Sequence, residues 1–152
     1  MITVVSEAPD TPDARILLDE LSNTLSAITG SSGKTSFDPN DARLENARFA
    51  IARDEFGKAV GCGAFRPLEG SVAEVKRMYS RRCMPGIGSA VLLFLEKEAL
   101  MLGYVALRLE TRVVNKRAVA FYVRLGYHRI PNFGKYVGKA EAACFEKRLT
   151  RD

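Results

Sequence analysis

The chain has few of the residues that build metal centres and disulfide frameworks. His128 is its only histidine, and its three cysteines, Cys62, Cys83 and Cys144, are far apart and form no Cys-x-x-Cys pair. Zinc sites need clustered cysteine and histidine ligands, and disulfide frameworks need cysteines that can pair. The sequence therefore predicts no metal site and no disulfide scaffold.

Long apolar runs are also absent. No stretch approaches the roughly 20 apolar residues that cross a bilayer. The first residues, MITVVSEAPDTPD, lack the basic and apolar segments of a secretory signal. We therefore expect a cytoplasmic protein without a membrane partner. Its 152 residues, of which 47% are hydrophobic, suit one domain with one core over residues 1–152.

The net charge of +5 is spread along the chain, except for one basic knot. A basic surface can attract nucleic acid or a phosphorylated ligand. No nucleic-acid recognition motif and no basic stripe interleaved with aromatic residues accompanies the charge. We expect a phosphorylated ligand at the knot and no nucleic-acid partner. The knot consists of Lys76, Arg77, Arg81 and Arg82.

Hydrophobic periodicity and turn residues divide the chain into alternating elements. Helices are predicted over residues 12–28, 38–45, 86–102 and 115–125, and strands over 2–6, 48–53, 58–65, 72–80, 105–110, 127–130 and 142–149. Antiparallel hairpins come first, and a strand–helix–strand crossover follows. This order predicts a mixed α/β sheet flanked by helices. Gly61 and Gly63 weaken their strand and predict a bulge or a close approach.

The segment GSSGKT looks at first like a phosphate-binding P-loop. That motif needs a glycine five residues before the glycine of its Gly-Lys pair, and Ile28 holds this position. No strand precedes the segment either, so we reject this interpretation.

The helix predicted from Gly86 begins with PGIGSA, directly after a strand. A helix N-terminus concentrates unpaired N–H groups and the positive end of the helix dipole, and glycine allows a ligand to approach closely. Arg81 and Arg82 stand just upstream. The start of this helix is therefore a candidate anion site.

Two segments resemble the sequence motifs of one enzyme family. VKRMYSRRCMPGIGSAVLLFLE resembles motif A of the GNAT acetyltransferases, a strand followed by a Gly-rich loop and a helix. NKRAVAFYVRLGY resembles their motif B and keeps Asn115, Ala118, Phe121, Tyr122, Gly126 and Tyr127.

The resemblance implies a GNAT-like, mostly antiparallel sheet of six or seven strands with a central βαβ crossover. It also implies transfer of an acetyl group from acetyl-CoA, as co-substrate, to the primary amine of a small molecule or peptide. Dimers are common in the family, so a homodimer is one expected state.

The resemblance also implies how acetyl-CoA binds. The pantetheine arm pairs with the strand at Met78–Ser80, which splays from the strand over 105–110, and the pyrophosphate lies on the N–H groups at the helix start. The predicted cofactor-binding residues are Met78, Tyr79, Ser80, Arg81, Arg82, Gly86, Ile87, Gly88, Ser89, Asn115, Arg117 and Tyr122.

Three catalytic roles follow for direct attack by the amine. Tyr122 matches the family's general acid at the sulfur, and the N–H of Met78 is expected to stabilise the oxyanion. Glu74 is the expected base, because the resemblance to the GNAT histone acetyltransferases implies a base glutamate four residues before Met78. Residues 74, 76 and 78 of a regular strand also share one face. Glu110 on the facing strand, or a water chain, are the alternatives.

The chain departs from motif A in the loop before the helix. Cys83 stands where the family has glutamine or arginine, Met84 replaces a glycine, and Pro85 brings no N–H group. Arg81 or Arg82 could supply the missing charge. The departure leaves open a second hypothesis, in which the protein is an acyl-CoA-binding regulatory module without catalysis.

Two further features lie near the C-terminus. His128 is interpreted as a residue of the strand surface. The segment PNFGKYVGK is a loop, for which structural packing and contact with the acceptor are equally compatible with the sequence.

Overall fold

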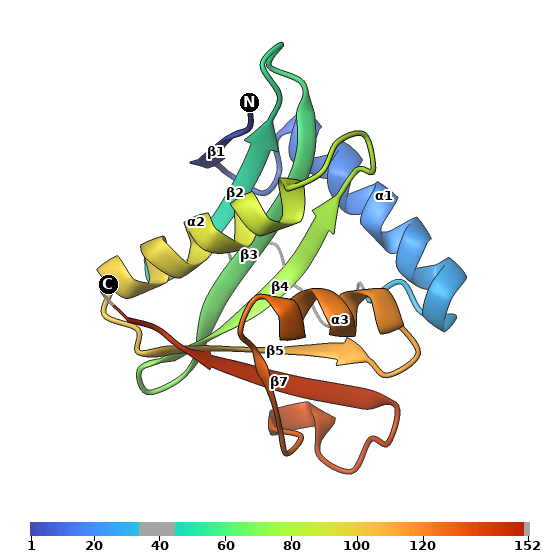
Figure 1. Ribbon diagram of the computed structural model, residues 1–152, viewed down its shortest axis with the longest axis vertical. Coiled ribbons are helices and arrows are strands. Elements are labelled where there is room, and N and C mark those ends of the chain that lie inside the picture. The colour runs from blue at the N-terminus through green and yellow to red at the C-terminus, as the bar shows by residue number, and fades with distance from the viewer. Residues whose placement is uncertain (34–44, 151–152) are drawn as a thin grey trace.

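The computed structural model describes residues 1–33 and 45–150 (Figure 1). Its elements follow the predicted order, and the second strand of the first hairpin, Ala59–Glu69, extends beyond the predicted range of 58–65. The elements are β1 (Thr3–Ser6), α1 (Pro12–Thr29), β2 (Arg48–Arg53), β3 (Ala59–Glu69), β4 (Val72–Ser80), α2 (Ile87–Met101), β5 (Ala106–Arg112), α3 (Lys116–Arg124), β6 (His128–Ile130), a 3₁₀ helix (Gly134–Tyr136) and β7 (Ala142–Arg148). The helix predicted over 38–45 lies outside the described residues, apart from Glu45.

One sheet runs through the molecule in the strand order β1-β2-β3-β4-β5-β7-β6. All neighbouring strands are antiparallel except β4 and β5, which are parallel and joined by α2. This arrangement confirms the predicted mixed sheet with a central βαβ crossover.

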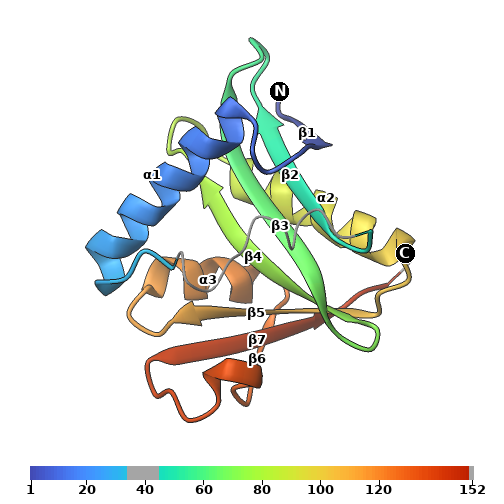
Figure 2. The ribbon, with the colours of Figure 1, turned by 180° about the vertical axis from the view of Figure 1, so that it is seen from behind.

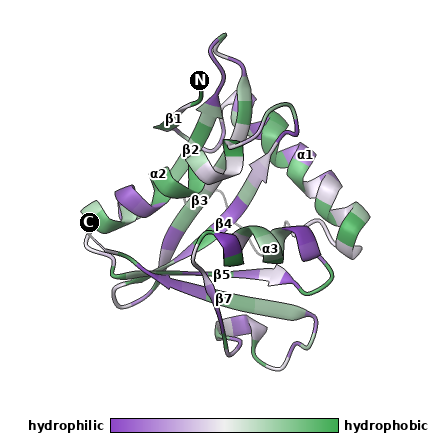
Figure 3. Ribbon diagram, viewed as in Figure 1, coloured by the Kyte–Doolittle hydropathy of each residue, from purple (hydrophilic) through white to green (hydrophobic). Residues whose placement is uncertain are grey.

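The helices cover the sheet from both sides. The helices α2 and α3 lie against one face, and α1 lies against the other (Figures 1 and 2). Hydrophobic residues run along most of α2 (Figure 3), and its buried residues Val91, Leu92 and Leu95 form the largest core with β3, β4 and β5. Burial of these side chains fixes the crossover helix on the sheet at roughly 25 cal/mol per Å² of apolar surface.

A β-bulge interrupts β4 at Arg77. The register pairs Cys62 with Tyr79 and Ala64 with Lys76, so two residues of β4 stand opposite Gly63 alone. Arg77 has a positive φ of 56°, which a residue with a Cβ adopts only under local constraint. The glycines of β3 therefore mark a bulge, as predicted.

The bulge corrects the predicted face of Glu74. Lys76 and Arg77 both point to the α1 side, and Met78 consequently turns to the α2 side, where it packs with the main core. Glu74 points to the side opposite that of Met78, where it contacts Tyr136 of the 3₁₀ helix. The prediction that Glu74 and Met78 share a face was wrong, because the extra residue shifts the alternation by one.

The parallel strands β4 and β5 separate along their length. They pair only at Val72–Glu74 with Ala106–Arg108. Beyond these pairs, neither β3 nor β5 offers Met78 a partner in the register. The splayed half of this strand pair leaves room for the site.

Candidate active site

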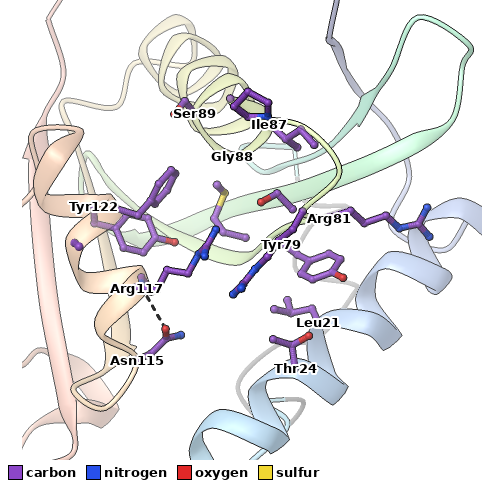
Figure 4. A pocket seen from close by; sticks show the side chains of 18 of the residues that line it. Leu21, Thr24, Tyr79, Arg81, Ile87, Gly88, Ser89, Asn115, Arg117 and Tyr122 are labelled. Atoms are coloured by element: carbon purple, nitrogen blue, oxygen red, sulfur yellow. Dashed lines mark hydrogen bonds between the residues drawn. The ribbon is translucent and has the colours of Figure 1, made fainter.

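A cavity of about 670 Å³ lies at the splay, and we call it the larger cavity to distinguish it from a smaller one beside it. Residues of α1, β4, α3 and the loop leading into α2 line it (Figure 4). All twelve predicted cofactor-binding residues are among them. The charged residues among its described lining are arginines without exception, namely Arg81, Arg82, Arg117 and Arg124. The larger cavity therefore suits a ligand with negative charge.

The first turn of α2 opens toward this cavity. Its N-cap, Gly86, has a φ of 86° and supplies no side-chain hydrogen bond. At Gly88, a Cβ would lie 3.2 Å from the ring of Phe121 and 3.8 Å from Oγ of Ser80. The first N–H groups of a helix have no intrahelical acceptor, so this turn can donate to a ligand's oxygens.

The two arginines before α2 have different surroundings. Nη2 of Arg81 is 2.6 Å from a carboxylate oxygen of Glu20 in α1, and Nε of Arg81 is 2.9 Å from the other oxygen. The Arg81 hydrogen bond lowers the pKa of Glu20, and the same bond raises the pKa of Arg81. Arg82 is exposed on the lining, and Cys83 is exposed outside it. Arg81 is therefore bound to α1, whereas Arg82 is an exposed cation on the lining of the larger cavity.

Tyr122 lies where the two cavities meet. It belongs to the lining of both, and its side chain extends from α3 into the space that Leu21 and Thr24 of α1 bound on the other side (Figure 4). Its hydroxyl makes no hydrogen bond to a described residue. Burial raises the pKa of Tyr122. The phenol is therefore protonated at neutral pH and available as a donor.

Asn115 and Met78 share this junction. The side chain of Asn115 caps α3 by accepting a hydrogen bond of 3.2 Å from the N–H of Ala118. This bond uses its carbonyl oxygen and leaves its NH₂ group for other partners.

The smaller cavity, of about 180 Å³, lies beyond Tyr122 and Met78. The two linings have six residues in common: Leu21, Leu25, Met78, Asn115, Ala118 and Tyr122. The rest of the smaller cavity comes from α1 and the segment after it, from β4 around the bulge, from the end of β5 and from Tyr136 of the 3₁₀ helix. The two spaces therefore form the two sides of one site.

Glu74 lines neither cavity. Its side chain is 1% exposed, and both of its oxygens are engaged. One accepts a hydrogen bond of 2.8 Å from Arg66, and the other accepts one of 2.9 Å from the hydroxyl of Tyr136, with Nζ of Lys76 at 3.6 Å. This carboxylate anchors Tyr136 and Lys76 beneath the smaller cavity.

Glu110 does line the smaller cavity. One oxygen, Oε2, is buried without a hydrogen bond to a described residue, and Nε of Arg112 lies 3.7 Å away. Burial raises the pKa of Glu110 above that of an ordinary carboxyl group. Glu110 therefore has the position and the basicity of a proton acceptor.

The structure divides the basic knot: Arg81 and Arg82 line the larger cavity, whereas Lys76 and Arg77 line the smaller one. Lys76 lies there beside Tyr136, for which no specific role was predicted. Nζ of Lys76 donates a hydrogen bond of 3.0 Å to the hydroxyl of Tyr136, and burial lowers the pKa of this lysine. Both residues line the smaller cavity. The aromatic residues of PNFGKYVGK were the only available signal, and Tyr136 shows that this loop both packs and lines the site.

Other sequence-based expectations concern residues outside the two cavities. His128 is exposed on β6 and lines neither cavity, as expected of a strand-surface residue. Within residues 1–33 and 45–150, no group of three or more histidine, cysteine or carboxylate side chains is placed to hold a metal ion. In the same residues, no helix has the length and apolar character needed to cross a membrane.

Comparisons with known proteins agree with this geometry. The chain is 33% identical over 151 residues to an IAA acetyltransferase of Azospirillum brasilense, which covers 97% of this chain and 98% of that protein. It is 27% identical to a solved structure from Klebsiella pneumoniae subsp. pneumoniae with a proposed acyl-CoA N-acyltransferase activity, with a TM-score of 0.83 over 99% of each chain. A GNAT-family acetyltransferase of Staphylococcus aureus shares the fold at 14% identity, with a TM-score of 0.78 over 99% of this chain and 100% of that one.

The family model described as "Acetyltransferase (GNAT) family" matches residues 17–127. This range includes both motifs, the splay and all the lining residues that the motifs predict. The chain therefore belongs to the GNAT acetyltransferase family.

Proposed function

We propose that this protein transfers the acetyl group of acetyl-CoA to the primary amine of a small molecule or peptide. One observation carries the proposal: the twelve residues predicted from the two motifs surround one cavity, which meets a second cavity at Tyr122. In this proposal residues 1–152 act as one domain in the cytoplasm, without a nucleic-acid partner, as a monomer or a homodimer.

The larger cavity fits acetyl-CoA in three respects. Its volume is within the range of cofactor sites. The first turn of α2 presents N–H groups for phosphate oxygens, and the absence of a Cβ at Gly88 keeps the space in front of Phe121 open. Acetyl-CoA brings an activated thioester to such a site, and the arginines of the lining supply charge for its phosphates.

The chain's own residues account for the remaining chemistry. Glu110 accepts a proton from the acceptor ammonium, which frees the nitrogen lone pair to form a bond with the acetyl carbon. The N–H of Met78, a residue without a Cα partner in the register with β3 or β5, stabilises the negative oxygen. Tyr122 then donates its proton to the sulfur as the carbon–sulfur bond breaks, and the second proton of the attacking nitrogen returns to the Tyr122 phenolate. The products are an amide and a free thiol, with the first proton on Glu110.

Glu110 takes the base role because Glu74 is committed elsewhere. A base must reach the proton that it removes, either directly or through one water molecule. Glu74 is buried outside both linings and accepts hydrogen bonds from Arg66 and Tyr136. Glu110 lines the smaller cavity together with Met78 and Tyr122.

The decisive experiment is a calorimetric titration with acetyl-CoA, beside an assay of thiol release over a panel of amines. We expect a Kd in the micromolar range for the wild type. Gly88→Val should weaken binding about tenfold or more, because its side chain would contact Phe121 and close the approach to α2. Circular dichroism controls for the fold of the variant. Absence of binding at millimolar acetyl-CoA would overturn the proposal.

A second candidate, an acyl-CoA-binding module without catalysis, is favoured by one observation. Arg81 is bound to Glu20, and Pro85 offers no N–H, so the cradle before α2 has fewer donors than the motif provides. Micromolar binding of acetyl-CoA with no thiol release from any amine in the panel would establish this candidate.

A further inference from the structure

The smaller cavity has an unusual charge balance for a site that accepts amines. Among its described lining residues, Lys76, Arg77 and Arg112 are cationic, and Glu110 is the one acidic residue. An acceptor with several ammonium groups would need several carboxylates to replace its hydration. This lining offers one carboxylate, which matches one ammonium group, and an excess of positive charge beside it.

The three cations differ in how far the protein already engages them. Lys76 donates to Tyr136 and pairs with Glu74, and Arg77 donates to Ser22 of α1 and to backbone oxygens. These contacts hold both side chains on the α1 side of the sheet.

Arg112 is held loosely by comparison. Its guanidinium lies 3.7 Å from Glu110 and 3.4 Å from Glu141, and it makes no hydrogen bond to a described residue. Glu141 is 56% exposed, so its attraction is screened by solvent. A guanidinium has five N–H groups in a fork that matches a carboxylate. Arg112 is therefore a cation at the cavity whose donors can bind a ligand.

Glu110 and Arg112 stand side by side at the cavity. They are two residues apart on β5, so they point to the same face of the sheet. Their side chains place a negative and a positive group next to one another. An α-amino acid presents the opposite arrangement, an ammonium and a carboxylate joined through one carbon.

We propose that the acceptor is a small amine that also carries a carboxylate, with the size and charge of an amino acid. Arg112 binds the carboxylate, and Glu110 faces the ammonium that becomes the nucleophile. This inference rests on the proposed function and adds the substrate class and a specificity-determining residue. The volume of the cavity, about 180 Å³, agrees with an acceptor of this size.

Matched pairs of acceptors test the inference. Thiol release would be measured with glycine, L-serine, L-methionine and L-glutamate, each beside its α-carboxamide, and with tyramine and spermidine as amines without a carboxylate. The ammonium of an amino-acid amide loses its proton more easily than that of the parent acid. A preference for the acid therefore cannot come from easier deprotonation.

For the wild type, we expect kcat/KM to be at least about tenfold higher for at least one amino acid than for its amide. Arg112→Gln should reduce this ratio toward one, mainly through a higher KM for the acid. Arg112→Lys keeps the charge without the fork and should give an intermediate ratio. Arg148→Gln removes an equal charge from an exposed position on β7 outside both linings and should leave the ratio unchanged.

The outcomes distinguish failure of this inference from failure of the proposed function. Equal use of acids and amides, preference for tyramine or spermidine, or a ratio that Arg112→Gln leaves intact would overturn the inference while acetyl transfer stands. Thiol release from none of the amines would overturn the proposed function and this inference with it.

Discussion

The two cavities that meet at Tyr122 are built in different ways. Most of the larger cavity comes from two short segments of the chain, one from the end of β4 to the start of α2, and the other α3 with its N-cap. The smaller cavity gathers residues from α1, β4, β5, α3 and the 3₁₀ helix. A ligand in the larger cavity therefore meets a local backbone motif, and a ligand in the smaller one meets side chains that only the tertiary fold brings together.

Their electrostatics differ in the same way. The larger cavity is lined by arginines and by the N–H groups at the start of α2. Their positive charges and dipoles do not depend on burial. In the smaller cavity, burial lowers the pKa of Lys76 and raises the pKa values of Glu110 and Tyr136. The shifted pKa values favour proton transfer on the side of the smaller cavity, and the start of α2 favours phosphate binding on the side of the larger cavity.

The substitution with the largest expected effect on catalysis lies at the junction of the two cavities. Tyr122→Phe should lower kcat about 10³-fold, because it removes the proton donor for the thiolate. The Kd for acetyl-CoA should change less than twofold, since the ring and its contacts with Phe121 and Tyr127 remain. Single-turnover thiol release and calorimetry measure the two quantities.

Tyr127→Phe is the matched control. The hydroxyl of Tyr127 donates to Glu96 in the core and lines neither cavity, so its loss should cost stability of about 1 kcal/mol and leave kcat intact. If Tyr122→Phe kept full activity, Tyr122 would not be the general acid, and the junction with the smaller cavity would lose its proposed role in protonating the thiolate.

The next largest effect distinguishes the two candidate bases, Glu110 and Glu74. Glu110→Gln should lower kcat/KM about 10²-fold and abolish the rise of kcat/KM with pH. A base acts when deprotonated, so this rise occurs as pH passes through the pKa of Glu110, above that of an ordinary carboxyl group. Because a raised pKa disfavours the charged form in the folded state, stability falls as pH rises through this range. Glu110→Gln should therefore not lower Tm at neutral pH.

Glu74→Gln should behave in the opposite manner. It weakens the buried contacts with Arg66 and Lys76, so the free energy of unfolding should fall by roughly 2 kcal/mol. The rise of kcat/KM with pH should persist. A lost pH dependence in Glu74→Gln and an intact one in Glu110→Gln would restore Glu74 as the base.

The same contrast explains what the sequence could predict. Each of motifs A and B is a continuous stretch of sequence, and together they predict twelve of the residues that line the larger cavity. The glycines Gly61 and Gly63 also predicted a bulge. At Gly63, a Cβ would lie 2.4 Å from the sulfur of Met78, which explains why this position of β3 has no side chain.

The predicted face of Glu74 relative to Met78 was wrong, because the rule of regular strand alternation does not hold across the bulge. The bulged residue is Arg77, which carries no local signal for a positive φ, so the regular alternation placed Glu74 with Met78. Burial of Glu74 depends on Arg66 and on Tyr136, which is 62 residues away in the chain. No periodicity in the sequence reveals a contact between residues so far apart in the chain.

The smallest effect is expected at the arginine that the structure places against α1. Arg81→Gln should lower the free energy of unfolding by about 0.5–1 kcal/mol, because its ion pair with Glu20 is partly exposed. The depressed pKa of Glu20 adds stability above its unfolded pKa, and this contribution is lost as pH falls through the folded value.

The Kd for acetyl-CoA should stay within twofold in Arg81→Gln, because the side chain already donates to Glu20 and to the backbone oxygen of Ala59. Arg82→Gln, at an exposed position of the same lining, should weaken binding several-fold more. Glu20→Gln frees Arg81 and should leave binding unchanged or tighten it. A loss of affinity in Arg81→Gln that Glu20→Gln does not share would show that Arg81 leaves α1 to hold the ligand, and the larger cavity would then also depend on a tertiary contact.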